Sequence, residues 1–309
     1  MEVLVAMAIG VAIGATIFPG WLKTINENLT ILTTACLIFA MGVTLGSRPT
    51  FLEELGSVGF SSVMFCLLPV FFSTLFVYIL TRIFMKDIIA RHKHDAQHKE
   101  EQDGNNGEVV IIVLSLAALI GGVAYGMSQK HFYFLDLIPA HSELILYFLM
   151  IFVGVSVGMS RGLIAKIKQY HIKTFIIPAG ILAGTILGGL LAALICGISL
   201  PTGAAIASGL GWYSLSGVML TGIAGAQIGS ITFLSNLLRE LVSYFSIPLI
   251  ARHLNYPTCI APAGATSEDT TLPMMIRCTN EETVVLSVVN GVVCSVMVPL
   301  LIQFFSTFI

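Results

Sequence analysis

Residues 226–250 read AQIGSITFLSNLLRELVSYFSIPLI, an apolar run of membrane-spanning length that carries Glu240 and an arginine near its middle. A second stretch, ATSEDTTLP at residues 265–273, places Glu268 and Asp269 between two apolar segments. A carboxylate at the centre of a bilayer costs about 2.5–3.5 kcal/mol on insertion scales, so it is rarely kept without a use. Buried acids of this kind usually line a path for ions, protons or a charged substrate.

The composition is that of an integral membrane protein. Of the 309 residues, 56% are hydrophobic and 10% are charged, against about 25% charged residues in soluble domains. Several apolar runs exceed the roughly 20 residues that cross a bilayer. The predicted spans cover residues 2–19, 29–46, 57–84, 109–127, 142–159, 174–199, 226–250 and 282–308. A net charge of −2 does not favour a nucleic-acid partner, and the six cysteines lack metal-ligand or disulfide spacing, so we expect no cofactor.

The first span and the longest hydrophilic stretch decide the domain organisation. The first 19 residues lack a basic n-region and a small-residue cleavage site, so we expect a retained helix rather than a signal peptide. Residues 86–108 are hydrophilic and contain an Asp-Gly-Asn-Asn-Gly run, which predicts a flexible cytoplasmic loop. The loop histidines His92, His94 and His98 could bind a metal ion, but a solvated loop is the favoured interpretation. We expect a single transporter domain over residues 1–309.

The placement of lysine and arginine predicts the orientation. Loops on the side of the N-terminus carry Arg48 and Lys130. The opposite loops carry Lys23, Arg82, Lys86, Arg91, Lys93, Lys99, Arg161, Lys166, Lys168, Lys173 and Arg252. Because cytoplasmic loops are enriched in basic residues, both termini are expected outside the cytoplasm.

Two apolar stretches do not fit a simple span. Residues 200–225 are rich in Gly, Ser and Thr, and residues 257–276 contain Pro262, Gly264 and Pro273. Irregular backbone at membrane depth is tolerated only where it is buried in protein or lines a wet cavity. Both stretches are therefore predicted to be re-entrant or broken helices.

The sequence also contains two similar glycine motifs, which we call the internal echo. Gly-Val-Thr-Leu-Gly at residues 42–46 resembles Gly-Val-Ser-Val-Gly at residues 154–158, and the two runs end spans that cross in opposite directions. Such an arrangement is typical of the inverted-topology repeats of secondary transporters. Two independent Gly-x-x-x-Gly helix-packing faces are the alternative. The fold class expected is all-α and polytopic, with about eight transmembrane helices, two re-entrant or broken segments and an inverted repeat.

Glu240 belongs to a polar stripe. At helical spacing, Thr232, Asn236, Glu240 and Ser243 share one face, which must lie against protein or water. The functional interpretation is a carboxylate that exchanges protons or binds a cationic substrate. The alternative is a buried clamp in which Arg239 pairs with a carboxylate between helices.

The second acidic stretch is poorly suited to a helix. A Gly-Ala-Thr-Ser approach at residues 264–267 and the following Thr-Thr-Leu-Pro leave Asp269 and Glu268 able to act as ligands. Two acids in one cavity repel each other, which favours proton exchange near neutral pH. The ordinary alternative is a helix N-terminus capped by Ser267 or Asp269.

The run Gly-Leu-Gly-Trp-Tyr-Ser-Leu-Ser-Gly at residues 209–217 combines close backbone approach with aromatic rings and hydroxyls. Trp212 or Tyr213 could hold an ammonium group by a cation–π contact, but for the rings taken alone anchoring at the membrane interface is the favoured interpretation. Ser214 and Ser216 add hydroxyls, and a broken-helix N-terminus nearby could hold a carboxylate.

These motifs resemble those of a known family. The runs ASGLGWYSLSG (residues 207–217), LREL (238–241) and GATS (264–267), with Asp269 and the following Thr-Leu-Pro, look like the LysO lysine exporters, most densely over residues 200–276. The resemblance implies a bacterial inner-membrane protein that exports L-lysine and its analogue thialysine, with eight spans and periplasmic termini. It also implies that an intramembrane acidic pair, matching Glu240 and Asp269 here, is essential. Glu268 has no counterpart in the motif.

The function expected is export of a cationic amino acid in exchange for protons. Glu240 and Asp269 would hold protons and the substrate ammonium in turn, while residues 209–217 and the turn with Thr266 and Ser267 would hold the substrate's α-amino and α-carboxylate groups. An intramembrane protease is disfavoured because no histidine lies within a span and no Gly-x-Gly-Asp motif occurs. A sodium-coupled carrier for another small amino or organic acid is the alternative transporter.

Overall fold

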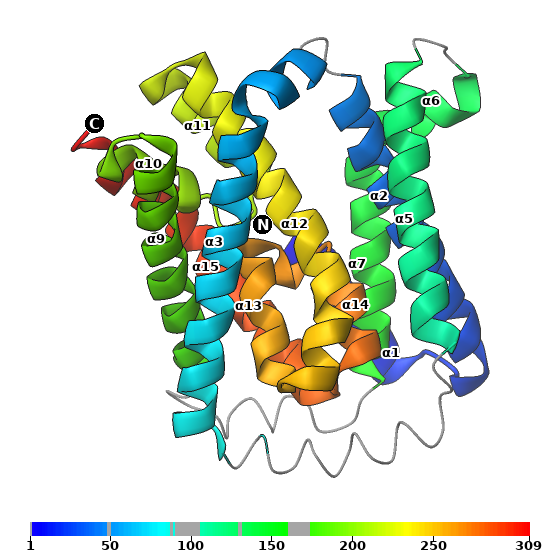
Figure 1. Cartoon of the computed structure of the whole chain (residues 1–309). Coiled ribbons are helices and arrows are strands. Elements are labelled where there is room, and N and C mark those ends of the chain that lie inside the picture. The colour runs from blue at the N-terminus through cyan, green and yellow to red at the C-terminus, as the bar shows by residue number, and fades with distance from the viewer. Residues whose placement is uncertain (1, 48–50, 87–88, 90–105, 129–131, 160–173) are drawn as a thin grey trace. The chain divides into compact units, whose positions relative to one another are not determined.

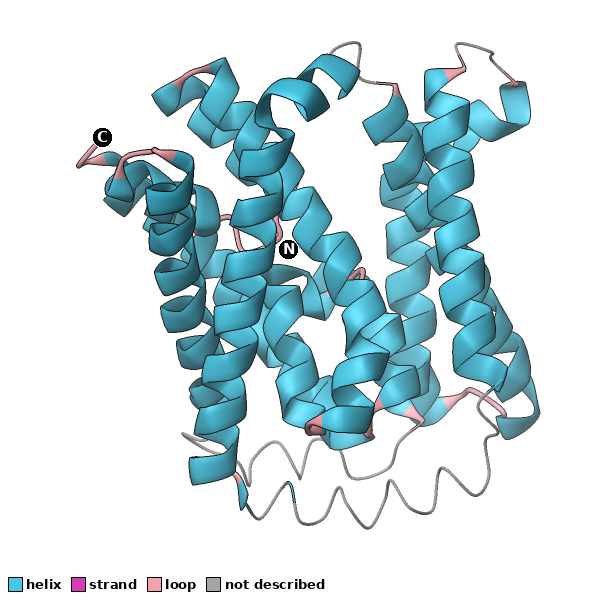
Figure 2. Cartoon of the chain, in the orientation of Figure 1, coloured by secondary structure: helices cyan, strands magenta, loops and turns pink. Residues whose placement is uncertain are grey.

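The computed structural model describes residues 2–47, 51–86, 89, 106–128, 132–159 and 174–309 (Figure 1). Figure 2 shows that these residues form helices joined by short loops and no strands. The chain divides into two compact units, residues 1–52 with 100–168 and residues 53–99 with 169–309. The all-α prediction is confirmed, whereas a single transporter domain over the whole chain remains a prediction.

Every predicted span lies on one helix of the structure. These helices are α1 (Glu2–Thr16), α2 (Lys23–Gly46), α3 (Phe51–Phe84), α5 (Asn106–Met127), α7 (Ser142–Gly158), α9 (Ile176–Cys196), α12 (Ala226–His253) and α15 (Glu281–Ser306). Shorter elements are η1 (Gly20–Leu22), α6 (Tyr133–Ala140), α10 (Leu200–Ala207), α11 (Tyr213–Ala224), η3 (Tyr256–Cys259), α13 (Ile260–Ala263), η4 (Gly264–Glu268) and α14 (Leu272–Cys278).

In the described part of the chain, four helical segments are long and apolar enough to cross a membrane, judged by length and composition. They are Gly20–Gly46, Val58–Phe84, Ile176–Cys196 and Glu281–Ser306. The apolar segments of α1, α5, α7 and α11 are shorter. Helix α12 has the length of a span but carries the polar stripe of Glu240, which lowers its hydropathy. These helices support a multi-pass membrane protein.

In the first unit, glycine pairs bring helices into close contact. Helix α1 packs on α7, where a Cβ atom on Gly10 would overlap the Ile151 carbonyl oxygen and one on Gly158 would overlap that of Val11. Helix α2 packs on α5 in the same way, with Gly42 opposite Gly122. Small residues at such spacing let helix backbones approach within a membrane. In both pairs the residue numbers rise together, so the paired helices are parallel.

Each Gly-x-x-x-Gly run of the internal echo therefore packs against a second such run, at residues 10–14 in α1 and 122–126 in α5. The runs in α1 and α5 are separated by 112 positions, as are those in α2 and α7. These glycines therefore make close helix contacts in both pairs, with the same spacing of 112 positions between the corresponding runs. The inverted repeat remains a prediction.

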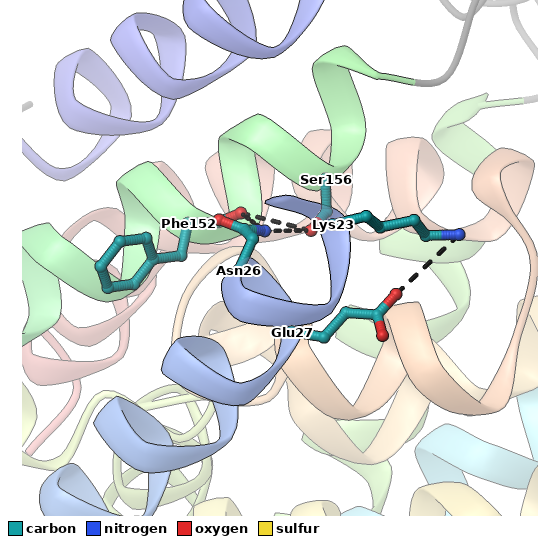
Figure 3. A network of polar contacts seen from close by, with 5 residues as sticks. All are labelled: Lys23, Asn26, Glu27, Phe152 and Ser156. Atoms are coloured by element: carbon teal, nitrogen blue, oxygen red, sulfur yellow. Dashed lines mark hydrogen bonds and ion pairs between the residues drawn. The ribbon is translucent and has the colours of Figure 1, made fainter. Parts of the chain in front are cut away.

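Asn26 fixes the direction of α2 relative to α7 (Figure 3). Its Nδ2 donates to the carbonyl oxygen of Phe152 and to Oγ of Ser156, both at 2.9 Å, so the first turn of α2 lies beside the last turns of α7. Lys23 and Glu27, which lie one helical turn apart on either side of Asn26, form an exposed ion pair with a distance of 3.9 Å. Such a pair contributes little to stability. Helices α2 and α7 are thus antiparallel, and so are α1 and α5.

The second unit contains two helical hairpins that turn back halfway along α12. Hairpin A, residues 200–224, consists of α10, a break and α11; α11 follows the N-terminal half of α12, with Gly217 against Phe233. Hairpin B, residues 256–278, consists of η3, α13, a break and α14, and it follows the C-terminal half of α12, with Cys259 near the Ile247 carbonyl group. The hairpins therefore enter from opposite ends of α12 (Figure 1).

The two hairpins begin with the same local sequence. Ser199 and Asn255 are each followed by x-Pro-Thr, and each side chain accepts a hydrogen bond from the amide of the threonine. An N-cap with proline in the first turn is a strong helix start, because proline lacks the N–H group that would otherwise be unpaired there. This repeated start explains why both hairpins begin with helical structure.

The tips of the hairpins meet through their backbones. The Ala265 amide donates to the Leu210 carbonyl oxygen at 2.9 Å. Gly211 and Gly264 have φ angles of 97° and 60°, in the region that glycine adopts without strain. A Cβ atom on Gly264 would also crowd the Leu210 carbonyl oxygen, so glycine is required there for both reasons.

Three buried side chains from long helices bind the free backbone groups of these tips. Asn236 of α12 accepts from the Gly211 amide at 2.8 Å and donates to the Ile206 carbonyl oxygen at 3.2 Å. Asn290 of α15 donates to the Gly264 carbonyl oxygen at 2.9 Å. Arg239 of α12 donates to the carbonyl groups of Ala261 and Pro262 in α13. Without such donors, broken helices within a membrane would leave polar backbone unsatisfied.

All three nitrogens of the Arg239 guanidinium group donate hydrogen bonds that connect α12 with hairpin B and α9. Its Nε donates to the Pro262 carbonyl oxygen at 2.9 Å, and one terminal nitrogen donates to that of Ala261 at 3.3 Å. The other terminal nitrogen donates to Oγ1 of Thr185 in α9 at 3.1 Å. A cation beside the C-terminal carbonyl groups of a short helix also complements the helix dipole.

We expect Gly122→Ala to destabilise the protein while Gly121→Ala does not. A Cβ atom on Gly122 would overlap the Phe39 carbonyl oxygen, whereas one on Gly121 meets nothing within 4 Å. Thermal unfolding of the two purified variants in detergent measures the difference. Equal midpoints would show that the close contact of α2 and α5 does not stabilise the unit.

We expect Arg239→Met to lower the thermal midpoint by several degrees, and the exposed Arg277→Met of hairpin B to leave it nearly unchanged. The first substitution leaves buried carbonyl groups without their charged donor, at a cost of about 1–3 kcal/mol for each group. The same thermal assay compares them, and an unchanged midpoint for Arg239→Met would contradict the anchoring role.

Candidate functional site

The predicted acidic pair comes together where the tip of hairpin B reaches the middle of α12. Glu240 projects from α12 with 4% of its surface exposed, and its Oε1 accepts a hydrogen bond from Oγ1 of Thr270. The Thr270 amide donates to Oδ1 of Asp269 at 2.6 Å, and Thr270 Oγ1 lies 3.2 Å from the same oxygen. Thr270 therefore joins the two carboxyl groups.

The second oxygen of Glu240 is left over. Oε2 is buried and has no hydrogen-bond partner among the residues that the structure describes. An ionised carboxylate buried without a partner is strongly unfavourable. Oε2 is thus the oxygen of the Glu240 carboxyl group that the described residues leave unsatisfied.

The local sequence explains why the acids lie on an irregular segment. After η4 the chain bends at Asp269, and α14 starts with Thr271 as its N-cap residue and a proline in its first turn. The Thr271 side chain makes no capping bond, because its hydroxyl donates to the Thr266 carbonyl oxygen at 2.8 Å. The alternative in which Ser267 or Asp269 caps a helix is therefore wrong, and the Asp269 carboxyl group bonds to the next residue instead.

Three predicted site residues use their polar groups to hold the backbone. Asn236 binds the tip of hairpin A. Ser267 donates to the Ser287 carbonyl oxygen at 2.8 Å, and Thr266 donates to that of Ala263 at 3.0 Å. In the arrangement observed, these side chains shape the site around Glu240.

The aromatic and hydroxyl residues of hairpin A differ in burial and in the groups they contact. Ser216 is buried and donates to the Trp212 carbonyl oxygen at 2.7 Å, whereas Ser214 is exposed and Trp212 is 38% exposed. Tyr213 packs edge-on against Phe233, with ring centroids 5.2 Å apart, and interacts electrostatically with both Glu240 and Asp269. Of these residues, Tyr213 is the one that the structure brings to the acidic pair.

Glu268 points to a different neighbour. Its Oε1 accepts from Ser295 Oγ of α15 at 3.0 Å, and its side chain packs where Gly291 leaves room. Asp269, by contrast, contacts Thr270 on the side of Glu240. Successive residues of the irregular segment therefore direct their carboxyl groups to α15 and α12 respectively. Glu268 nevertheless interacts electrostatically with Asp269, and its Oε2, like that of Glu240, is buried without a hydrogen-bond partner among the described residues.

The buried Arg–carboxylate clamp is not observed. Within the described ranges the structure contains one ion pair, Lys23 with Glu27, while the Arg239 guanidinium binds carbonyl groups and Thr185. The sequence analysis also missed Thr270 and Asn290; the place of Thr270 directly after Asp269 was the available signal. The loop histidines at positions 92, 94 and 98 lie outside the described residues.

Comparisons with known proteins identify the family of the chain. The chain matches the Lys_export family, described as lysine exporter LysO, over residues 116–306. It is 31% identical over 291 residues to "Lysine exporter LysO" of Escherichia coli strain K12, covering 92% of this chain and 91% of that protein. It is 34% identical over 197 residues to a "Putative lysine exporter" of Haemophilus influenzae, covering 62% of this chain and 97% of that protein.

No solved structure matches the chain. The family match covers most of the chain and includes both hairpins, α12 and α15, which hold the acidic pair. The resemblance inferred from the sequence motifs is confirmed, and it indicates a transporter rather than an enzyme. This chain belongs to the LysO family of lysine exporters.

Proposed function

We propose that this protein exports L-lysine, and its analogue thialysine, across the bacterial inner membrane in exchange for protons at Glu240 and Asp269. The observation that carries the proposal is the junction of the two carboxyl groups at Thr270, with one Glu240 oxygen buried and unpartnered. The family match supports the substrate, because a relative of nearly the same length is named a lysine exporter.

The charges of the site suit a cationic amino acid. Lysine carries two ammonium groups and one carboxylate, so one ammonium group binds between Glu240 and Asp269 as a charge-assisted donor. The α-carboxylate binds at the N-terminus of α11, which starts at Tyr213 without a side-chain cap and is therefore open to an anion. The exposed Ser214 hydroxyl lies in the first turn of that helix.

Proton coupling follows from the proximity of the two acids. Two neighbouring carboxylates in a desolvated site repel each other, so the empty pair retains a proton. A lysine ammonium group supplies the positive charge that this proton supplied, and its binding releases the proton. Substrate and proton thus compete for the same pair, which is the requirement for exchange.

Hydrogen bonding at the hairpin tips favours protons over sodium. In sodium-coupled carriers with broken helices, unwound carbonyl groups commonly bind the ion. Here the carbonyl groups at the tips accept protein donors: Leu210 from Ala265, Ala261 and Pro262 from Arg239, Ala263 from Thr266, and Gly264 from Asn290. The fixed Arg239 guanidinium thereby takes the place that a coupling cation would occupy.

The basic residues of the second unit support the proposed orientation. Arg82, Arg252 and Arg277 end α3, α12 and α14, which lie at the end of the unit where hairpin B enters. No lysine or arginine occurs in residues 197–226 or 299–309, which belong to the opposite end. We place the basic end in the cytoplasm and both termini in the periplasm, with eight spans and hairpins A and B as re-entrant segments.

Inverted repeats complete the proposed topology. In the first unit α1 and α2 correspond to α5 and α7 with reversed directions. In the second unit hairpin A with α12 corresponds to hairpin B with α15, and Asn236 and Asn290 occupy equivalent positions. Such pairs of opposed elements are typical of transporters that open a central site to either side of the membrane in turn.

We expect Glu240→Gln and Asp269→Asn each to reduce lysine transport at least tenfold. Purified protein in sodium-free liposomes should accumulate labelled lysine when the lumen is more acidic than the bath, because outward proton flow drives lysine inward. Glu27→Gln, which alters an exposed carboxylate in the first unit, is the matched control and should leave transport unchanged. Full activity of Glu240→Gln would refute the role of the pair.

The same liposomes separate protons from sodium. We expect accumulation to follow the pH gradient and to be unaffected by an imposed sodium gradient. Lysine accumulation that required sodium and ignored the pH gradient would instead identify a sodium-coupled carrier.

We expect alkaline phosphatase fused after Ile309 to be active in intact cells, because this reporter matures only in the periplasm. A fluorescent protein fused after Ile309 should be dark when exported through the Sec pathway, and one fused after Lys86 should fluoresce. The reverse pattern would contradict the proposed orientation.

A further inference from the structure

The Thr270 hydroxyl group faces two acceptors but has one proton to donate. Oγ1 contacts Glu240 Oε1 and lies 3.2 Å from Asp269 Oδ1, so it can donate to one carboxyl group at a time. While it donates this proton, the hydroxyl oxygen still has lone pairs that can accept a hydrogen bond. When one carboxyl group is protonated, it can donate to Thr270 while Thr270 donates to the other.

The geometry holds the hydroxyl in this bridging position. The Thr270 amide is bonded to Asp269 Oδ1 at 2.6 Å, which fixes the backbone of Thr270 relative to the Asp269 carboxyl group. The neighbouring Thr271 hydroxyl cannot substitute, because it donates to the Thr266 carbonyl oxygen. Thr270 is thus the side chain that contacts both members of the pair.

Three other ionisable side chains, Tyr213, Glu268 and Arg239, lie near the segment that contains Thr270. Tyr213 of α11 interacts with both acids, and Arg239 of α12 binds carbonyl groups of hairpin B. Glu268 accepts from Ser295 of α15 and interacts electrostatically with Asp269, but it makes no hydrogen bond to Thr270. Thr270 therefore lies between two carboxyl groups rather than between a carboxyl group and a fixed cation. A hydroxyl in that setting connects two sites that are both able to hold a proton.

We propose that Thr270 is a positioning residue that relays one proton between Asp269 and Glu240, so that the pair exchanges protons as one unit. In the transfer, the O–H bond of Asp269 breaks as its proton binds Thr270 Oγ1, and the original Thr270 O–H bond breaks as that proton binds Glu240. Thr270 ends unchanged, with one proton moved and no net change in charge of the pair. This inference rests on the proposed lysine–proton exchange and adds the route between its two acids.

The test compares Thr270→Val, which removes the hydroxyl at nearly constant volume, with Thr270→Ser, which keeps it. Two readouts in liposomes separate binding from proton transfer. Exchange of labelled for unlabelled lysine at equal pH needs substrate binding and alternate opening of the site but no proton transfer between the acids. Lysine-driven proton movement, followed with a trapped pH-sensitive dye, also needs the relay. Thr34→Val is the matched control, because Thr34 is a buried threonine bonded within its own helix.

We expect Thr270→Val to retain lysine–lysine exchange within about threefold while losing at least tenfold in proton movement, and Thr270→Ser and Thr34→Val to keep both. Normal proton movement in Thr270→Val would overturn the relay, as would equal loss of both activities, since the hydroxyl would then serve binding. If Thr270→Val does not yield folded protein, Thr270→Ala is measured against the same expectations. Absence of lysine exchange in the unmodified protein would instead refute the proposed function.

Discussion

The burial of the Glu240 carboxyl group is the constraint on which the second unit depends. A carboxyl group that is 4% exposed in the middle of a 28-residue helix is tolerated only if nearby groups compensate for lost hydration. Hairpin B supplies Thr270 for one oxygen and leaves the other without a partner. In the proposed exchange, a proton or the substrate ammonium group binds the oxygen that has no partner.

Thr270 and Asp269 reach the middle of α12 because the helix of hairpin B is broken there. The break leaves backbone carbonyl and amide groups that need hydrogen-bond partners from elsewhere in the protein. Asn236, Arg239 and Asn290 meet that demand from the long helices, and the amide of Ala265 meets it between the two tips. Because these donors bind backbone rather than acids, the pair of Glu240 and Asp269 has no arginine or lysine partner in the described residues. In the proposed exchange, the transported cation takes the place of such a partner.

Much of this arrangement could be predicted from the sequence, because the bilayer imposes long apolar runs and penalises misplaced charge. Each predicted span lies on a helix, and the stripe through Asn236 and Glu240 faces the hairpins as its spacing indicates. The partners of Arg239 could not be predicted, since they are carbonyl groups whose direction depends on where hairpin B turns. Thr270 was missed for a related reason: its importance lies in being between two carboxyl groups from segments distant in sequence. The similarity of the glycine runs that begin at residues 42 and 154 was recognised in the sequence. The runs at residues 10 and 122, against which they pack and which share the spacing of 112 residues, were not.

The central claim is that lysine and a proton compete for Glu240 and Asp269. Its most direct test is the release of protons when lysine binds to the purified protein in weakly buffered, sodium-free detergent solution, recorded with a pH-sensitive dye. The account predicts a release that saturates with lysine binding and disappears in the Glu240→Gln, Asp269→Asn double variant. Lysine binding that saturates without any change in bound protons would contradict it.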